Sequence, residues 1–152
     1  MPSGALLGLD AVRAAKEGTF ESVTMVTRKP PAGLAGAPHL INNNISIDNL
    51  QEPKMVFEGT AREGAMGFPA NVNVAAALSL AGPGPDNVSL QVWADPTIDR
   101  NTHTIKVIAS AASFELKMLS IPTAEKPATG RIVALSVIAS LRAQVATLVV
   151  GA

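Results

Sequence analysis

The spacing of apolar residues along the chain predicts three clear helices. Residues 71–82 and 131–150 show the strongest helical pattern, and the first of these two segments is rich in alanine. A third helix is predicted over residues 4–17, with Ser3 as its N-cap and Gly18 as its stop. The three segments are long enough to pack against a sheet.

A short fourth helix is predicted from capping residues. Thr60 is followed three residues later by Glu63, which is the spacing of a capping box. We therefore expect one or two helical turns that end before Pro69. Asn71 is the expected cap of the alanine-rich helix.

Alternating apolar and polar residues predict strands over residues 22–30, 54–59, 88–96, 102–110 and 113–121. The last three strands follow one another closely, as hairpin-linked strands do. Strands interleaved with helices in this way predict an α+β fold, with one mixed, mostly antiparallel sheet and helices packed on one face. The alanine-rich helix and the C-terminal helix are the candidates to cover that face.

Residues 31–53 form a segment rich in proline, glycine and asparagine. We predict a long surface loop here, with a short strand over residues 45–47. A loop of this length in a compact domain is usually functional or mobile. The length of 152 residues fits a single domain over 1–152.

Composition narrows the possible functions. Twelve basic and twelve acidic residues give a net charge of zero, which argues against a nucleic-acid partner. No apolar run approaches the roughly 18 residues of a membrane-spanning helix, and the first residues do not resemble a signal peptide. The chain has no cysteine, which excludes disulfides and thiolate chemistry and leads us to expect a cytoplasmic protein.

His103 is the one residue with an obvious capacity for proton transfer. It follows a polar turn and starts a predicted strand, and imidazole titrates close to neutral pH. Two interpretations are open: an exposed polar residue at a strand edge, or a catalytic acid–base group. Asn101, two residues earlier, can lie on the same side of the chain and orient a ligand or the ring. His39, in the proline-rich segment, is interpreted as a surface residue.

Amide groups supply further candidate contacts. The "PSGA" turn at residues 2–5 places backbone N–H groups at a predicted helix start, where an anion or an amide oxygen can bind. Asn73 lies in the first turn of the alanine-rich helix and is either a second local cap or a side chain directed at a ligand. No glycine-rich nucleotide fingerprint, metal-binding motif or carboxylate pair is present in the sequence.

Four stretches together resemble the C-terminal domain of the L-aspartate dehydrogenases. They are "PSGALLGLDAVRAA", "TRKPP", "FEGTAREGAMGFPANVNVAAALSLAG" and "ADPTIDRNTHTI", in the family's order. The resemblance implies one half of a two-domain NAD- or NADP-dependent enzyme. Such an enzyme oxidises L-aspartate to iminoaspartate, which enters NAD biosynthesis or hydrolyses to oxaloacetate and ammonia.

The resemblance also implies roles for individual residues. The family's catalytic histidine corresponds to His103, and its cofactor contacts correspond to Ala5 and Asn73. Asn101 and Thr129 are our own candidates for substrate contacts. Near Thr129 the family usually reads N-P-K-T where this chain reads "KPAT", so a basic side chain is missing from Ala128 and Lys126 is its possible replacement.

The family's Rossmann domain has no counterpart in this sequence. We therefore expect the isolated chain to be weak or inactive, with a Rossmann domain as its partner and a homodimer formed through the open face of the sheet. Two alternatives are a non-enzymatic oligomerisation domain and the partner domain of a dehydrogenase for another amino acid. The choice between NAD and NADP is open, since the residue that reads the ribose belongs to the Rossmann domain.

Overall fold

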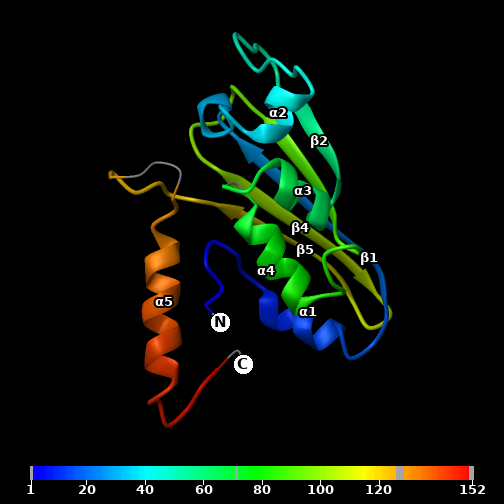
Figure 1. Cartoon of the computed structure of the whole chain (residues 1–152). Coiled ribbons are helices and arrows are strands. Elements are labelled where there is room, and N and C mark those ends of the chain that lie inside the picture. The colour runs from blue at the N-terminus through cyan, green and yellow to red at the C-terminus, as the bar shows by residue number, and fades with distance from the viewer. Residues whose placement is uncertain (1, 71, 126–128, 151–152) are drawn as a thin grey trace.

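The computed structural model describes residues 2–70, 72–125 and 129–150. A mixed sheet and short helices make up most of it (Figure 1). In chain order the elements are α1 (Leu9–Ala15), β1 (Phe20–Lys29), η1 (Pro31–Gly33), α2 (Pro38–Asn42), β2 (Lys54–Thr60), α3 (Ala61–Gly67), α4 (Asn73–Ala81), β3 (Ser89–Ala94), β4 (Thr102–Ala109), β5 (Ser113–Leu119) and α5 (Ile132–Ala143).

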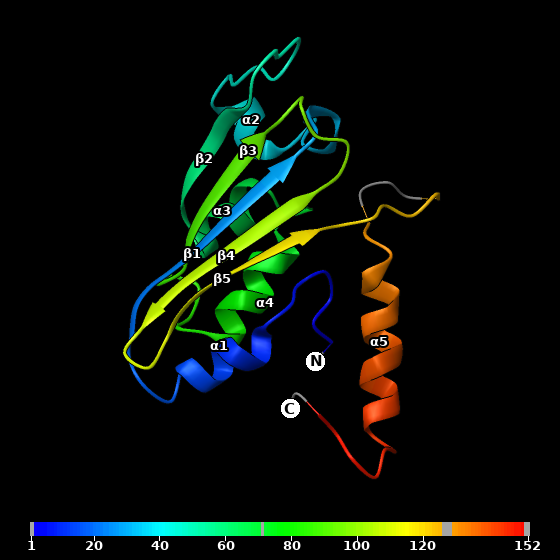
Figure 2. The same cartoon turned by 180° about the vertical axis from the view of Figure 1, so that it is seen from behind.

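The sheet has the strand order β2-β3-β1-β4-β5. Only the pairing of β1 with β3 is parallel, and the other three pairings are antiparallel. Helices α1, α3 and α4 lie on one face, and the opposite face is open when the molecule is seen from behind (Figures 1 and 2). The predicted α+β class, with a mixed, mostly antiparallel sheet, is confirmed.

The core lies between the sheet and these helices. Alternate residues of the central strands point into it, among them Met25, Leu90 and Ile105, which are almost completely inaccessible to solvent. Val12 of α1 and Leu78 of α4 pack against them from the helical layer. The buried face of α4 therefore forms part of the core.

The first helix is shorter than predicted. Ser3 is not its cap, because α1 begins at Leu9 with Gly8 as the N-cap. Gly4 and Gly8 have φ angles of 66° and 70°, a left-handed conformation that interrupts a helix and that glycine adopts without strain. Residues 3–6 therefore form a turn, in which the Leu6 N–H donates to the Ser3 carbonyl at 3.2 Å.

The capping residues have mixed outcomes. Thr60 caps α3 as predicted, and its side chain and that of Glu63 bond each other's backbone N–H. Asn71, the predicted cap of α4, lies outside the described residues, and the N-cap position belongs to Val72.

Residues 31–53 contain more structure than predicted. They include η1 and α2, and Leu34 and Leu40 are buried in the core. The predicted strand at 45–47 is wrong, because these residues have no ladder partner. Ile45 and Ile47 instead pack against the edge of the core.

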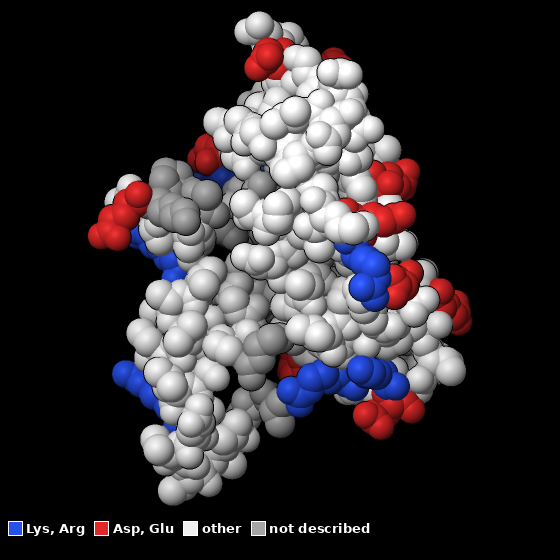
Figure 3. All heavy atoms as spheres, in the orientation of Figure 1, with Lys and Arg blue, Asp and Glu red and all other residues white. Residues whose placement is uncertain are grey.

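α5 does not cover the sheet, which corrects the prediction from its apolar pattern. The helix ends at Ala143 and stands apart from the helical layer (Figures 1 and 2). None of its residues is buried, and Leu135, Ile138 and Leu141 are 57%, 47% and 60% exposed. Figure 3 shows this part of the molecule as a mostly uncharged lobe.

One hydrogen bond ties α5 to the start of the chain. The backbone N–H of Gly4 donates to Ser136 Oγ at 3.1 Å. Within the described part of the chain, no helix is long and apolar enough to cross a membrane.

Candidate active site

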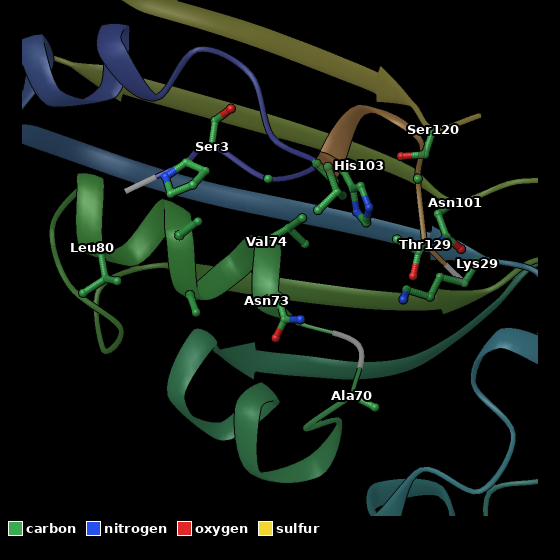
Figure 4. Close-up of a pocket in the computed structure, with 17 residues that line it drawn as sticks. Ser3, Lys29, Ala70, Asn73, Val74, Leu80, Asn101, His103, Ser120 and Thr129 are labelled. Carbon is green, nitrogen blue, oxygen red and sulfur yellow. The ribbon is translucent and has the colours of Figure 1, made fainter. Parts of the chain in front are cut away.

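A cavity of about 570 Å³ lies where the ends of three strands meet residues 2–5 and one side of α4 (Figure 4). β1 contributes Lys29, β4 contributes His103, and Ser120 follows β5. The predicted site residues all line this cavity: Ala5, Asn73, Asn101, His103 and Thr129. Segments nearly the whole length of the chain apart therefore meet at one place.

His103 is buried, with 4% of its surface exposed. It lies on the covered side of β4, two and four residues before the core residues Ile105 and Val107. Its Nδ1 lies 3.2 Å from the hydroxyl oxygen of Thr27 on the neighbouring strand β1. The interpretation as an exposed strand-edge residue is wrong. Because Thr27 engages Nδ1, Nε2 is the ring nitrogen left for a ligand.

Lys29 is the second titratable side chain of the cavity wall. It ends β1 and is 5% exposed, so its ammonium group is largely removed from water. Burial lowers the pKa of Lys29 to about 8, so this side chain is still mostly charged at neutral pH. The cavity therefore carries a buried positive charge beside the imidazole.

The surroundings of His103 make its ring neutral. Two effects lower the pKa of His103 to about 4. Burial is the larger effect, and the positive charge of Lys29 is the smaller one. At neutral pH the imidazole can accept a proton but holds it weakly. This differs from the ordinary imidazole pKa on which the prediction of an acid–base role was based.

Three polar residues of the site were missed in the sequence: Thr27, Lys29 and Ser120. Thr27 and Lys29 continue the buried alternation of Val23 and Met25 along β1, where apolar residues are expected. A lysine at a core-facing strand position was the available signal. Ser120 had no such signal. Its Oγ is buried without a hydrogen-bond partner among the described residues.

Asn73 and Ala5 face the cavity from the helical side. Asn73 is the first residue of α4, and no side-chain cap bond is found at this helix start, so the local-cap interpretation lacks its hydrogen bond. The backbone N–H of Ala5 makes no hydrogen bond within the described chain. Both are donors that a bound amide or phosphate could use.

The remaining histidine has a packing role. The His39 ring is half-buried against Phe57 and Phe68, with centroid distances of 5.1 and 5.3 Å.

Across the residues that the structure places, no group of three or more histidine, aspartate or glutamate side chains could hold a metal ion. Of the "KPAT" stretch only Thr129 is described, so the possible replacement of the family's lysine by Lys126 lies outside the described residues.

The chain is similar to known proteins over most of its length. The family model "Aspartate dehydrogenase, C-terminal" matches residues 10–144. The chain belongs to this family. L-aspartate dehydrogenase of Bradyrhizobium diazoefficiens is 63% identical over 99% of the chain, and that of Methanosarcina mazei is 44% identical over 93%.

A solved structure shares the fold. The crystal structure of aspartate dehydrogenase from Thermotoga maritima aligns over 98% of this chain with a TM-score of 0.75 and 27% identity. The chain spans only about half the length of these proteins: 54% of the Bradyrhizobium and Thermotoga chains and 52% of the Methanosarcina chain.

Proposed function

We propose that this chain is the catalytic and substrate-binding half of an L-aspartate dehydrogenase. The observation that carries the proposal is the buried, neutral imidazole of His103 in a cavity that also contains Lys29 and the amide donors of Ala5 and Asn73. Membership of the family supports the same assignment.

The reaction removes two electrons from the substrate. The ammonium group of L-aspartate gives up a proton, the Cα–H bond breaks with its electron pair, and the nitrogen lone pair forms the C=N bond of iminoaspartate. Water then adds to Cα and ammonia leaves, giving oxaloacetate. His103 Nε2 would accept the proton from the ammonium group or from the attacking water, and Thr27 would keep the ring in orientation.

The cofactor supplies the electron-pair acceptor when it is bound, and it is NAD or NADP. We propose that the Ala5 N–H and the Asn73 side chain hold its nicotinamide end. Their fit rests on two observations: the Ala5 N–H has no hydrogen bond within the described chain, and the Asn73 side chain makes no local cap. Asn101 and Thr129 are proposed substrate contacts on the strand side of the same cavity.

Asn73→Ala should mainly weaken cofactor binding. We expect the cofactor Kd to rise by roughly tenfold, which corresponds to loss of one or two hydrogen bonds. The measurement is a fluorescence titration of the enzyme with reduced cofactor. Asn42→Ala, at the exposed end of α2, is the matched control. An unchanged Kd in Asn73→Ala would remove this residue from the cofactor site.

We propose that the apolar face of α5 is covered by a Rossmann domain, which we expect within the extra length of the relatives. Leu135, Ile138 and Leu141 leave a row of exposed apolar side chains that a monomeric surface rarely keeps. The hydrogen bond of Gly4 to Ser136 places the start of this chain against α5. A domain joined ahead of Gly4 would therefore emerge beside this apolar face.

Hydrogen exchange tests the docking of α5. In this chain joined to the nucleotide-binding half of the Bradyrhizobium relative, we expect α5 amides to exchange at least roughly tenfold more slowly than in this chain alone. Leu135→Asp with Leu141→Asp should abolish the difference, and Met66→Asp on the exposed face of α3 should not. Equal exchange with and without the added half would contradict the proposal. Concentration-dependent protection of the chain alone would point to a second copy instead.

The proposed activity has a direct assay in the same joined protein. We expect L-aspartate to give reduced cofactor, whereas L-glutamate and L-alanine give little, and the unjoined chain gives little with any substrate. A preference for another amino acid would favour the partner domain of a different dehydrogenase. No turnover with any amino acid, in a protein that binds cofactor, would favour the non-enzymatic oligomerisation domain.

Three further assignments stay predictions. They are a homodimer through the open face of the sheet, a cytoplasmic location, and supply of iminoaspartate to NAD biosynthesis. The open face carries charged and polar pairs such as Lys106 with Glu115 at 3.3 Å and Gln91 with Glu58 at 2.9 Å. A dimer formed there would be largely polar.

A further inference from the structure

Two buried polar groups of the cavity wall have no substrate or cofactor contact assigned to them in the proposed function. Lys29 lies at the end of β1 and Ser120 directly follows β5, and both are at least nine-tenths buried. Both line the cavity that contains His103 (Figure 4). Farther along β1, the buried positions Val23 and Met25 on the same face as Lys29 are apolar.

We propose that Lys29, assisted by Ser120, binds a carboxylate of the substrate, and that this carboxylate controls the ability of His103 to hold a proton. The inference rests on the proposed function and adds the group that recognises a dicarboxylate. Lys29 offers a positive charge with N–H donors, and Ser120 offers a hydroxyl donor. A carboxylate accepts such charge-assisted hydrogen bonds strongly when water is excluded.

The neighbouring arginine does not compete for this role. Arg28 alternates to the other side of β1, where its Nε lies 3.0 Å from Asp95 and its guanidinium stacks on Trp93 at 5.5 Å. Its charge is therefore already balanced. The described residues that line the cavity include no aspartate or glutamate, so its net charge is positive at neutral pH.

The carboxylate and the imidazole are linked through Lys29. Lys29 lowers the pKa of His103, so an anion bound beside Lys29 offsets that charge and raises the pKa of His103 again. Among the described residues, the strand partners of His103 are Thr27 on β1 and Met118 on β5, neither of which titrates, and α4 carries no titratable side chain. By reciprocity, protonated His103 binds the anion more tightly.

The proposal implies an order of events in the reaction, in which substrate binding precedes the increase in the basicity of His103. In the free protein His103 holds a proton weakly, as its pKa of about 4 shows. Binding of a dicarboxylate makes the same ring a stronger base next to the ammonium group it must deprotonate. An amino acid without the second carboxylate would bind less tightly and would leave His103 a weaker base. Lys29 would therefore favour a dicarboxylate substrate both in binding and in proton transfer.

NMR of the His103 ring in this chain, without cofactor, tests the proposal. Succinate is the probe, and His39→Gln assigns the two histidine signals. We expect saturating succinate to raise the pKa of His103 by about one pH unit. In Lys29→Met the pKa of His103 should be higher before any ligand is added, and the succinate Kd should rise at least roughly tenfold.

Two other variants complete the design. Ser120→Ala should weaken succinate binding by about threefold and leave the pKa of His103 in the free protein unchanged. Lys106→Met is the matched control, since Lys106 is an exposed lysine of β4 paired with Glu115, and it should change neither quantity.

Three results would overturn the proposal: no succinate binding by the wild-type chain, equal succinate affinity in Lys29→Met, or equally tight binding of inorganic phosphate at the same site. The last would indicate a phosphate site of the cofactor instead. Because the experiment needs neither cofactor nor turnover, its failure is distinct from failure of the proposed dehydrogenase activity.

Discussion

His103→Ala is expected to lower turnover with L-aspartate by roughly a hundredfold or more in the chain joined to a nucleotide-binding half. The imidazole is the only neutral base on the described cavity wall, because Lys29 is mostly protonated at neutral pH. Without the ring, the substrate ammonium group must lose its proton to water. The KM for L-aspartate should change little, since the carboxylate contacts lie on other residues.

The measurement is the steady-state rate of reduced-cofactor formation at saturating L-aspartate. His39→Gln serves as the control, because His39 packs against Phe57 and Phe68 outside the cavity. A turnover of His103→Ala within a few-fold of the wild type would exclude His103 as the proton acceptor. A higher KM with unchanged turnover would assign His103 to substrate binding.

The burial of His103 should also make the fold sensitive to acid. The unfolded imidazole takes up a proton below about pH 6.5, whereas the folded one does so only near pH 4. Between these values the unfolded state binds more protons, so the free energy of unfolding falls as the pH falls. The loss from this residue is about 2 kcal/mol between pH 7 and pH 5, at about 1.4 kcal/mol per pH unit below 6.5.

Urea unfolding of the wild type and of His103→Gln at the two pH values measures this loss. Lys29 does not contribute in this range, because it is mostly protonated in both states. The variant should therefore lose about 2 kcal/mol less than the wild type. His39→Gln should follow the wild type. If His103→Gln and the wild type lose stability equally, the ring is not held neutral by the fold.

Much of the sheet was predictable because strand burial follows a two-residue period. Ile105 and Val107 alternate with exposed residues as the sequence indicates, and the same alternation assigns His103 to the buried face. The first helix was mispredicted because two glycines adopt positive φ angles in a segment whose apolar spacing suits a helix. α5 was misplaced because an apolar face indicates that a helix needs a partner but does not specify which one.

The site was only partly predictable for a related physical reason. Family motifs identified His103, Ala5 and Asn73, and the structure brings them to one cavity. The contact of Thr27 with His103 joins residues 76 positions apart, and no local spacing encodes it. The effect of Lys29 on the pKa of His103 likewise depends on the pairing of β1 with β4.

Transfer of deuterium from L-aspartate labelled at Cα tests the central claim most directly, since it follows the bond that the site is proposed to break. The joined protein should deliver one deuterium to the reduced cofactor for each oxaloacetate formed, and the nucleotide-binding half alone should deliver none. Recovery of the label in solvent water, or equal transfer without this chain, would contradict the account.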